Sequence, residues 1–368
     1  MRQVILSVLA ALVLVLAGPV NAQIEVLDRT GGPSGSQQND PAETAQDGEN
    51  SGQDQPAPLP CGTEDFTIAE MGWPSAAILA NIHAAILRAE FDCPVRLVPG
   101  EPEATLSSMA TTRQPAVAPE LWVSRQADVW NGAMQASSAR AASPSFSGGP
   151  LEAWFVPGYV IDNNPGLVAS ADVLDHWQVF APAGGERAEL ISCPADWACS
   201  IVNQNMASGL GLEDRFDIVE PLDRFALDAE ISEAVARRDP VLAYYWQPNA
   251  LIDRLDLVAL DMGGFDPGNA QCMAIRDCVP FEGSGFAPDT VVIAVAEWVF
   301  TDVPDVADYF ARAAMPLAEM NRLLAWQVEQ DASAEAVAQH FLIASRDIWR
   351  PWVGAPGDGD DDTESAED

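Results

Sequence analysis

Hydrophobic positions along the chain alternate between short apolar runs and longer stretches with helical spacing. Residues 66–69 predict a short buried strand. After a turn at 72–74, apolar residues recur every three or four positions over 78–89 and predict a helix. Residues 95–98 predict a second strand. These three segments form a β-α-β unit, whose two strands we expect to be parallel.

The same alternation continues through the rest of the chain. Further strands are predicted at 156–161, 241–245 and 291–296, and further helices near 223–237, 305–329 and 333–346. Strands that alternate with helices are typical of an α/β protein with mainly parallel sheets. The sequence shows no internal repeat.

Both ends of the chain differ from its middle. Residues 1–22 carry Arg2, an apolar run over 4–17 and small residues before Ala22, which predicts a signal peptide and export to the periplasm. Residues 23–60 predict a disordered acidic and polar linker, and 354–368 an acidic disordered tail. The roughly 290 residues between them suit two domains of ordinary size.

Acidic residues dominate the charge of the chain. There are 55 Asp and Glu against 18 basic residues, all of them Arg, for a net charge of −37. Such a surface repels phosphate backbones, so we expect no nucleic-acid partner. Strong like charge also keeps protein molecules apart, and we expect a monomer.

Six cysteines in an exported chain indicate disulfides. Fifteen pairings can be written. The spacing favours the local pairs Cys193–Cys199 and Cys272–Cys278, and elimination then leaves Cys61–Cys93. A zinc site is disfavoured because both tight pairs are C-x5-C and no histidine lies near either. We therefore expect no metal.

The sequence offers no catalytic constellation. Its three histidines, His83, His176 and His340, fall on helical stretches, and none lies beside a nucleophile. The nucleophile elbow, the P-loop, the dinucleotide fingerprint and the H-E-x-x-H zinc motif are all missing. The sequence therefore predicts neither an enzyme nor a cofactor.

Tryptophans give a stronger signal. Of eleven in the chain, five fall at predicted loops or strand ends: Trp73, Trp122, Trp154, Trp197 and Trp246. Ligands of open α/β sheets bind at the carboxyl ends of strands, where Trp73 and Trp246 are expected. The alternative for each is an ordinary core tryptophan. A packing role is the better interpretation for three others on the C-terminal helices, Trp326, Trp349 and Trp352.

A group of indole faces can hold a cation that donates no hydrogen bonds, such as trimethylammonium. Each ring contributes roughly 0.5–2 kcal/mol, so three or four supply much of the ~8 kcal/mol that micromolar affinity requires. A disulfide within 193–199 would also pin the amides of Ala198 and Cys199 in one direction, where they could receive a carboxylate.

Several segments carry a family resemblance: CGTEDFTIAEMGWPSAAILANIHAAIL, PELW, CPADWAC, AYYWQP and FLIASRDIWRPWV. Over 61–353 the chain resembles the glycine betaine/proline-type substrate-binding proteins of ABC importers. The resemblance implies a two-lobed periplasmic binding protein of type II, with a hinge and the ligand in the cleft between the lobes. Its three-tryptophan box would fall on Trp122, Trp197 and Trp246, and its carboxylate-binding amides on Ala198 and Cys199.

The chain departs from this family pattern at several positions. Gln126 stands where enteric betaine binders carry a histidine. Trp73, Trp154 and Glu152 are additional candidates for the site. Glu152 and Glu120 are also candidates to face the cation, with a solvated surface role as the alternative. These departures leave choline, trimethylamine N-oxide and dimethylsulfoniopropionate open as ligands, with proline less favoured.

We therefore expect a protein that captures a quaternary-ammonium compatible solute and delivers it to an ABC permease in the inner membrane. Lobe one should hold 61–157 and 288–353, and lobe two 158–287, with cleft closure around the ligand. A binder of amino acids or sugars would need a charged or hydroxyl-rich pocket. A sensor ectodomain would need a transmembrane segment, and a secreted hydrolase a nucleophile and a base.

Overall fold

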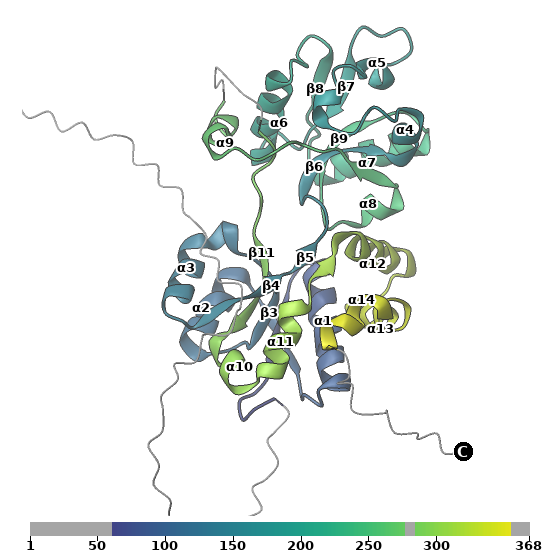
Figure 1. The fold of residues 1–368 in the computed structure, drawn as a ribbon. Helices are drawn as coiled ribbons and strands as arrows, with labels where there is room; N and C mark the ends of the chain where they lie inside the picture. Colours follow the sequence, from purple (N-terminus) through teal and green to yellow (C-terminus); the bar gives the residue numbers. More distant parts are fainter. Residues whose placement is uncertain (1–60, 277–283, 355–368) are drawn as a thin grey trace, which may run out of the picture.

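Two α/β lobes joined by narrow crossing segments make up the computed structural model, which describes residues 61–276 and 284–354 (Figure 1). The expected signal peptide, linker and acidic tail lie outside the described residues, apart from Gly354. Among the helices that are described, none has the length and apolar character needed to cross a membrane.

Lobe one, residues 61–147 and 291–354, is built on a five-stranded sheet of order β2-β1-β3-β11-β4. Its strands are β1 (Thr67–Met71), β2 (Arg96–Gly100), β3 (Val117–Trp122), β4 (Ala139–Pro144) and β11 (Val291–Ala296). Its helices are α1 (Pro74–Glu90), α2 (Pro102–Thr112), η1 (Val123–Gln126), α3 (Ala127–Gln135), α10 (Glu297–Asp302), α11 (Pro304–Arg312), α12 (Leu317–Gln330), α13 (Ala334–Ala344) and α14 (Arg346–Val353). The short strands β5 (Phe146–Ser147) and β12 (Met315–Pro316) pair separately.

Lobe two, residues 152–276 and 284–286, carries a second sheet of order β8-β7-β9-β6-β10. Its strands are β6 (Glu152–Pro157), β7 (Ala188–Ile191), β8 (Phe216–Val219), β9 (Leu242–Trp246) and β10 (Leu257–Ala259). Its helices are α4 (Gly158–Asn163), η2 (Ser170–Asp172), α5 (Trp177–Phe180), α6 (Ala198–Gly209), α7 (Arg224–Ala236), α8 (Ala250–Arg254) and α9 (Pro267–Met273).

The two sheets share one architecture although the sequence shows no repeat. In each, three strands run parallel (β2, β1 and β3 in one, β8, β7 and β9 in the other), and the next strand is antiparallel to its neighbours. That antiparallel strand always follows a crossing between the lobes. Residues 148–151 lead into β6, and residues 287–290 lead into β11. Every strand of the five-stranded sheet of lobe one therefore has a counterpart in the sheet of lobe two.

The lobe boundary and one strand differ from the sequence prediction. β6 pairs with β9 and β10, so residues 152–157 belong to lobe two and the crossing precedes Glu152 instead of following residue 157. The strand expected at 156–161 lies at 152–157, and residues 158–163 form α4. A short apolar run does not by itself distinguish a buried strand from a helical segment, which explains the error.

The sheets are mixed instead of mainly parallel. After crossing between the lobes, the chain runs through β6 and β11 in the direction opposite to the neighbouring strands β9 and β3. The helix predicted near 305–329 is also divided, into α11 and α12. Between them Met315 and Pro316 form β12. Met315 precedes a proline, and a residue in that position is disfavoured in helical conformation.

Two of the three predicted disulfides are confirmed. Cys61 is bonded to Cys93, which ties the start of lobe one to the segment after α1, and Cys193 is bonded to Cys199 in the first turn of α6. The third predicted pair includes Cys278, which lies outside the described residues.

The core of lobe one encloses a histidine. His83 on α1 is fully buried, and its Nδ1 lies 2.6 Å from the hydroxyl of Tyr309 on α11. Burial lowers the pKa of His83 to about 3. Trp349 and Trp352 are buried in the same core, as predicted for packing residues. His83 is therefore a neutral structural residue.

His83 should make the stability of the protein depend on pH. Its pKa is lower in the folded protein than in the unfolded chain, so between about pH 3 and 6.5 the unfolded chain binds more protons. The free energy of unfolding should fall as the pH drops through this window, by up to about 1.4 kcal/mol per pH unit. Replacing the imidazole in His83→Gln should flatten this dependence.

Urea unfolding of both proteins at pH 6 and pH 5 measures the effect, because most carboxyl groups stay ionised over that interval. The wild type should lose about 1 kcal/mol more than the variant. Equal losses would show that His83 is not the group that titrates.

Candidate ligand-binding site

A cavity of about 1010 Å³ lies between the two lobes. Lobe one contributes the end of β3 and the first turns of α1 and α2. Lobe two contributes the first residue of α7 and the segment that follows β9. The side chains that matter for its chemistry are Trp73, Glu120, Trp122, Gln126, Arg224 and Trp246.

Four tryptophans occupy corresponding positions in the two lobes. Trp73 precedes α1, the helix after β1, and Trp197 precedes α6, the helix after β7. Trp122 ends β3, and Trp246 ends β9. Each lobe therefore presents two indoles at the carboxyl edge of its sheet, where ligands of α/β proteins bind.

Three of the four line the cavity: Trp73 and Trp122 from lobe one and Trp246 from lobe two. Trp197 does not line it but packs edge-on against Trp246, with 5.6 Å between ring centroids. Trp246 also stacks on Tyr245 at 4.5 Å. The structure thus brings together four of the five tryptophans expected in the site.

Glu120 connects the two indoles of lobe one. Side chains alternate along a strand, so Glu120 and Trp122 lie on the same face of β3. Oε1 of Glu120 accepts hydrogen bonds from Nε1 of Trp73 at 2.7 Å and of Trp122 at 2.9 Å. The carboxyl group is buried, with 1% of the residue exposed, and its Oε2 has no hydrogen-bond partner.

Burial raises the pKa of Glu120, and the hydrogen bonds from Trp122 and Trp73 oppose that shift. Both donors are neutral. The carboxyl group is thus held by dipoles, and no cationic side chain contributes to its pKa shift.

The arginines of the cavity wall are already engaged by other groups. Arg125 lies over the ring of Trp122, 4.8 Å from its centroid, and pairs with Asp289 at 3.1 Å. Arg224 pairs with Asp228 at 3.5 Å. Their charges are therefore partly balanced before any ligand enters.

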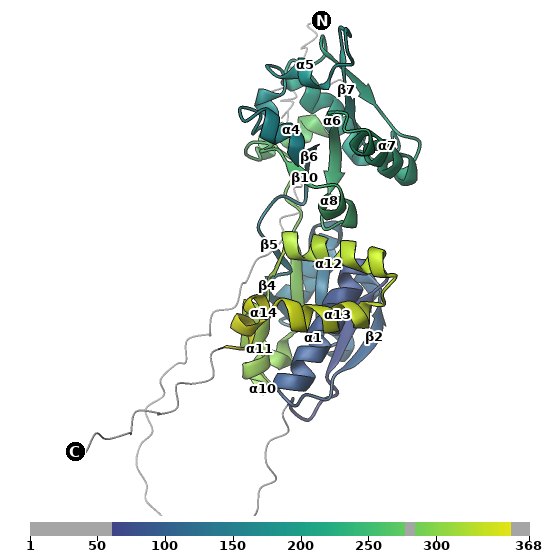
Figure 2. The same ribbon diagram turned by 90° about the vertical axis from the view of Figure 1, so that its right-hand side faces the viewer.

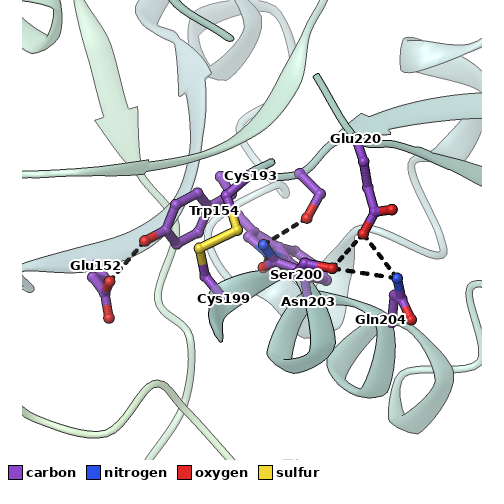
Figure 3. Close-up of a disulfide and its surroundings, with 10 residues drawn as sticks. Glu152, Trp154, Cys193, Cys199, Ser200, Asn203, Gln204 and Glu220 are labelled. Atoms are coloured by element: carbon purple, nitrogen blue, oxygen red, sulfur yellow. Dashed lines mark hydrogen bonds between the residues drawn. A yellow bond between two sulfur atoms is a disulfide. The ribbon is translucent and has the colours of Figure 1, made fainter. Parts of the chain in front are cut away.

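The Cys193–Cys199 disulfide fixes the start of α6 (Figure 3). Ser200 and Gln204 on this helix donate hydrogen bonds to Glu220, which follows β8. Ala198 and Cys199 are the first two residues of α6, so their N–H groups have no acceptor within the helix. These amides suit an anion, but neither residue lines the cavity in this conformation.

Trp154 belongs to the core of lobe two, so its expected place in the site is wrong. Its side chain is fully buried, and Nε1 donates to Oδ1 of Asn203 on α6 at 2.8 Å. The amide of Asn203 in turn donates to the hydroxyl of Ser192 at 2.9 Å (Figure 3). The physical reason is that β6 is an interior strand, between β9 and β10, so a residue in its middle is covered by α6.

Glu152 lies opposite Trp246 in the register of β6 and β9 but outside the main cavity. It lines a smaller cavity of about 420 Å³, together with Asp289. Its Oε1 accepts a hydrogen bond from the hydroxyl of Tyr244 at 2.7 Å. Burial raises the pKa of Glu152, and burial with the adjacent carboxylate raises the pKa of Tyr244.

The segment after Trp246 ties the two lobes together. Asn321, buried in α12 of lobe one, accepts from the backbone N–H of Asn249 at 2.8 Å and donates to Gln247 at 2.7 Å. The amide of Gln247 donates to the carbonyl of Pro150 in the first crossing segment at 2.6 Å. Figure 2 shows α8, which follows this segment, beside α12.

Sequence reasoning did not identify three features of the site and its surroundings. It offered Glu120 only as a group that might face a cation, not as the residue that joins Trp73 to Trp122. It also missed Arg224, and Asn321 as a link between lobes. One signal was available for Glu120, an acidic residue inside the otherwise apolar strand VAPELW. The other two depend on contacts between distant segments.

Comparison with known families gives a match over most of the chain. The family described as "Substrate binding domain of ABC-type glycine betaine transport system" matches residues 64–344. Proteins of this kind bind a solute outside the cytoplasm for an ABC transporter and are not enzymes.

Solved structures are similar at low sequence identity. Apo YehZ from Escherichia coli is 15% identical with a TM-score of 0.54, over 76% of this chain and 98% of that one. Lactococcal OpuAC in complex with glycine betaine is 12% identical with a TM-score of 0.48, over 79% and 99%. The glycine betaine, L-proline-binding protein ProX from Borrelia burgdorferi is 14% identical with a TM-score of 0.46, over 79% and 97%. The two-lobed α/β fold of a type II periplasmic binding protein is thereby confirmed.

Trp154→Phe should destabilise the fold, because it leaves the carbonyl oxygen of Asn203 buried without its donor. The expected loss is about 1–3 kcal/mol in the free energy of unfolding. Trp246→Phe, at a half-buried position on the cavity wall, should change it by less than about 0.5 kcal/mol. Urea unfolding of both variants measures the difference, and equal effects would contradict the core assignment of Trp154.

Proposed function

Because the chain belongs to the family of substrate-binding domains of ABC-type glycine betaine transport systems, we propose that it captures a quaternary-ammonium solute in the cavity between its lobes. The solute is glycine betaine or an analogue, and the loaded protein delivers it to an ABC permease in the inner membrane. The signal-peptide pattern of residues 1–22 supports capture in the periplasm as part of this proposal. The protein acts as a monomer.

One observation supports this function most strongly: indoles of both lobes meet in one cavity, Trp73 and Trp122 on one side and Trp246 on the other. A quaternary ammonium ion has no hydrogen to donate and spreads its charge over methyl groups. Aromatic faces suit it because they offer negative potential at a low cost of desolvation. A sugar or an amino acid would leave its hydroxyl or ammonium donors without acceptors on such faces.

Each lobe supplies part of the proposed site. Trp73 and Trp122 form a half-site in lobe one, fixed by their shared bond to Glu120. Trp246, with Trp197 behind it, forms the half-site of lobe two. A ligand that touches both half-sites stabilises the state in which they are close, so binding favours closure of the cleft.

The ligand's second end has its own receptor in this scheme. The amides of Ala198 and Cys199 lie at the start of α6, directly after Trp197. Rotation of lobe two toward lobe one would bring them to the cavity as an uncharged site for a carboxylate. A ligand that lacks a carboxylate would bind without them.

A thermal-shift panel tests the proposed function directly. Glycine betaine, choline, trimethylamine N-oxide and dimethylsulfoniopropionate are compared with proline and a sugar. A ligand present at 100 times its dissociation constant stabilises the folded state by about 2.7 kcal/mol and so raises the melting temperature. At least one methylated onium compound should do so, and the sugar should not. A panel without any onium response would contradict the proposal.

Trp246→Ala and Trp197→Ala should each weaken onium binding at least tenfold. A tenfold loss equals about 1.4 kcal/mol, which lies within the range that one ring contributes to a desolvated cation. Isothermal titration with the best ligand of the panel gives the dissociation constants.

Trp177→Ala provides the matched control. This indole lies in α5, on the part of lobe two far from the cavity (Figure 1). Its ring centroid is 4.7 Å from Cζ of Arg215. Its loss should leave the affinity unchanged. If both cleft variants bind as tightly as this control, the indoles do not form the ligand site.

A further inference from the structure

Glu120 is an unusual group for the wall of an apolar cavity. It is an acid buried among indoles, its Oε1 is fully used by Trp73 and Trp122, and its Oε2 has no hydrogen-bond partner. A buried carboxylate without a cationic partner is costly unless a proton or a cation neutralises it, and burial raises the pKa of Glu120 for that reason. The cavity it lines is where such a partner would enter.

We propose that Glu120 positions the two indoles of lobe one and makes the cavity select onium ligands that carry a net positive charge over zwitterions. The favoured class is an onium alcohol such as choline, or another carboxylate-free onium ion, and glycine betaine is disfavoured. This rests on the proposed function and deepens it by naming the charge class of the ligand.

The remaining charges of the cavity wall favour the same class. Its acidic side chains are Glu120 and the exposed Glu101 and Glu103. Its basic side chains are Arg125 and Arg224, which pair with Asp289 and Asp228. No cationic group of the wall is therefore free to receive a ligand's carboxylate.

A zwitterion gains less from Glu120 than a cation does. In glycine betaine the carboxylate is only two bonds from the nitrogen, so Glu120 attracts one end and repels the other. In choline the ammonium charge is unopposed, and the hydroxyl can donate to an oxygen such as Oε2. The amides of Ala198 and Cys199, which closure would bring to a carboxylate, carry no net charge, so they can receive that group but do not cancel the charge of Glu120.

Glu120→Gln separates charge from position. Glutamine keeps a side-chain oxygen that can accept from both indoles, so the half-site retains its shape while the charge is lost. A purely structural role of Glu120 would leave the ratio of the two affinities unchanged in this variant. A role in charge selection would change that ratio.

The experiment is isothermal titration of the full chain with choline and with glycine betaine. The wild type should bind choline at least tenfold more tightly than glycine betaine. Glu120→Gln should lose at least tenfold in affinity for choline and less than threefold for glycine betaine. Glu186→Gln, which removes an exposed acid of lobe two outside the cavity wall, should change either affinity by less than twofold.

Three results would overturn the inference: a wild type that prefers glycine betaine, equal losses for both ligands in Glu120→Gln, or an equally large effect of Glu186→Gln. The wild-type preference tests it even if the variant fails to fold, which the melting temperature reports. A wild type that binds onium compounds but has a higher affinity for glycine betaine than for choline contradicts only the charge selection. A wild type that binds no onium compound contradicts the proposed function as well.

Discussion

The fold depends on how the chain crosses between the lobes. After each crossing it inserts one strand, β6 or β11, antiparallel into a sheet whose other central strands run parallel. A strand inserted this way starts at the cleft, so its parallel neighbours must end there. The carboxyl edges of both sheets consequently face each other. This constraint places Trp122 at the end of β3 and Trp246 at the end of β9 on opposite sides of the same cavity.

The half-site of lobe one shows how a cation receptor can be built before a cation arrives. Indole faces are attractive to a methylated ammonium ion only if the rings are held apart and do not collapse on each other. The carboxyl group of Glu120 holds the two rings in place, because it binds the N–H edges of Trp73 and Trp122, which both line the cavity, while Arg125 lies over the ring of Trp122. The side chain of Glu120 thus fixes the positions of the two indoles and, in the proposal above, also supplies the negative charge that attracts a cation.

The sequence predicted the elements with a clear period and residues of special chemistry, but not long-range pairings. β1, β2, β9 and β11 lie within two residues of their expected positions, and α1 begins four residues before the predicted range. Both testable disulfides were identified, Cys193–Cys199 from spacing and Cys61–Cys93 by elimination. Trp154 was misplaced because a tryptophan before an apolar run looks the same in a core strand as at a cleft. The contact of Trp73 with Glu120 spans 47 positions, and no local pattern encodes it.

The tie formed by Asn321 has a mechanical consequence. It holds the residues after Trp246 against lobe one and the first crossing segment. When one body turns relative to another, points beside the pivot travel least and distant points travel most. Trp246 would thus move little as the lobes close, while the start of α6, with Trp197 and the N–H groups of Ala198 and Cys199, would travel farther and complete the enclosure last.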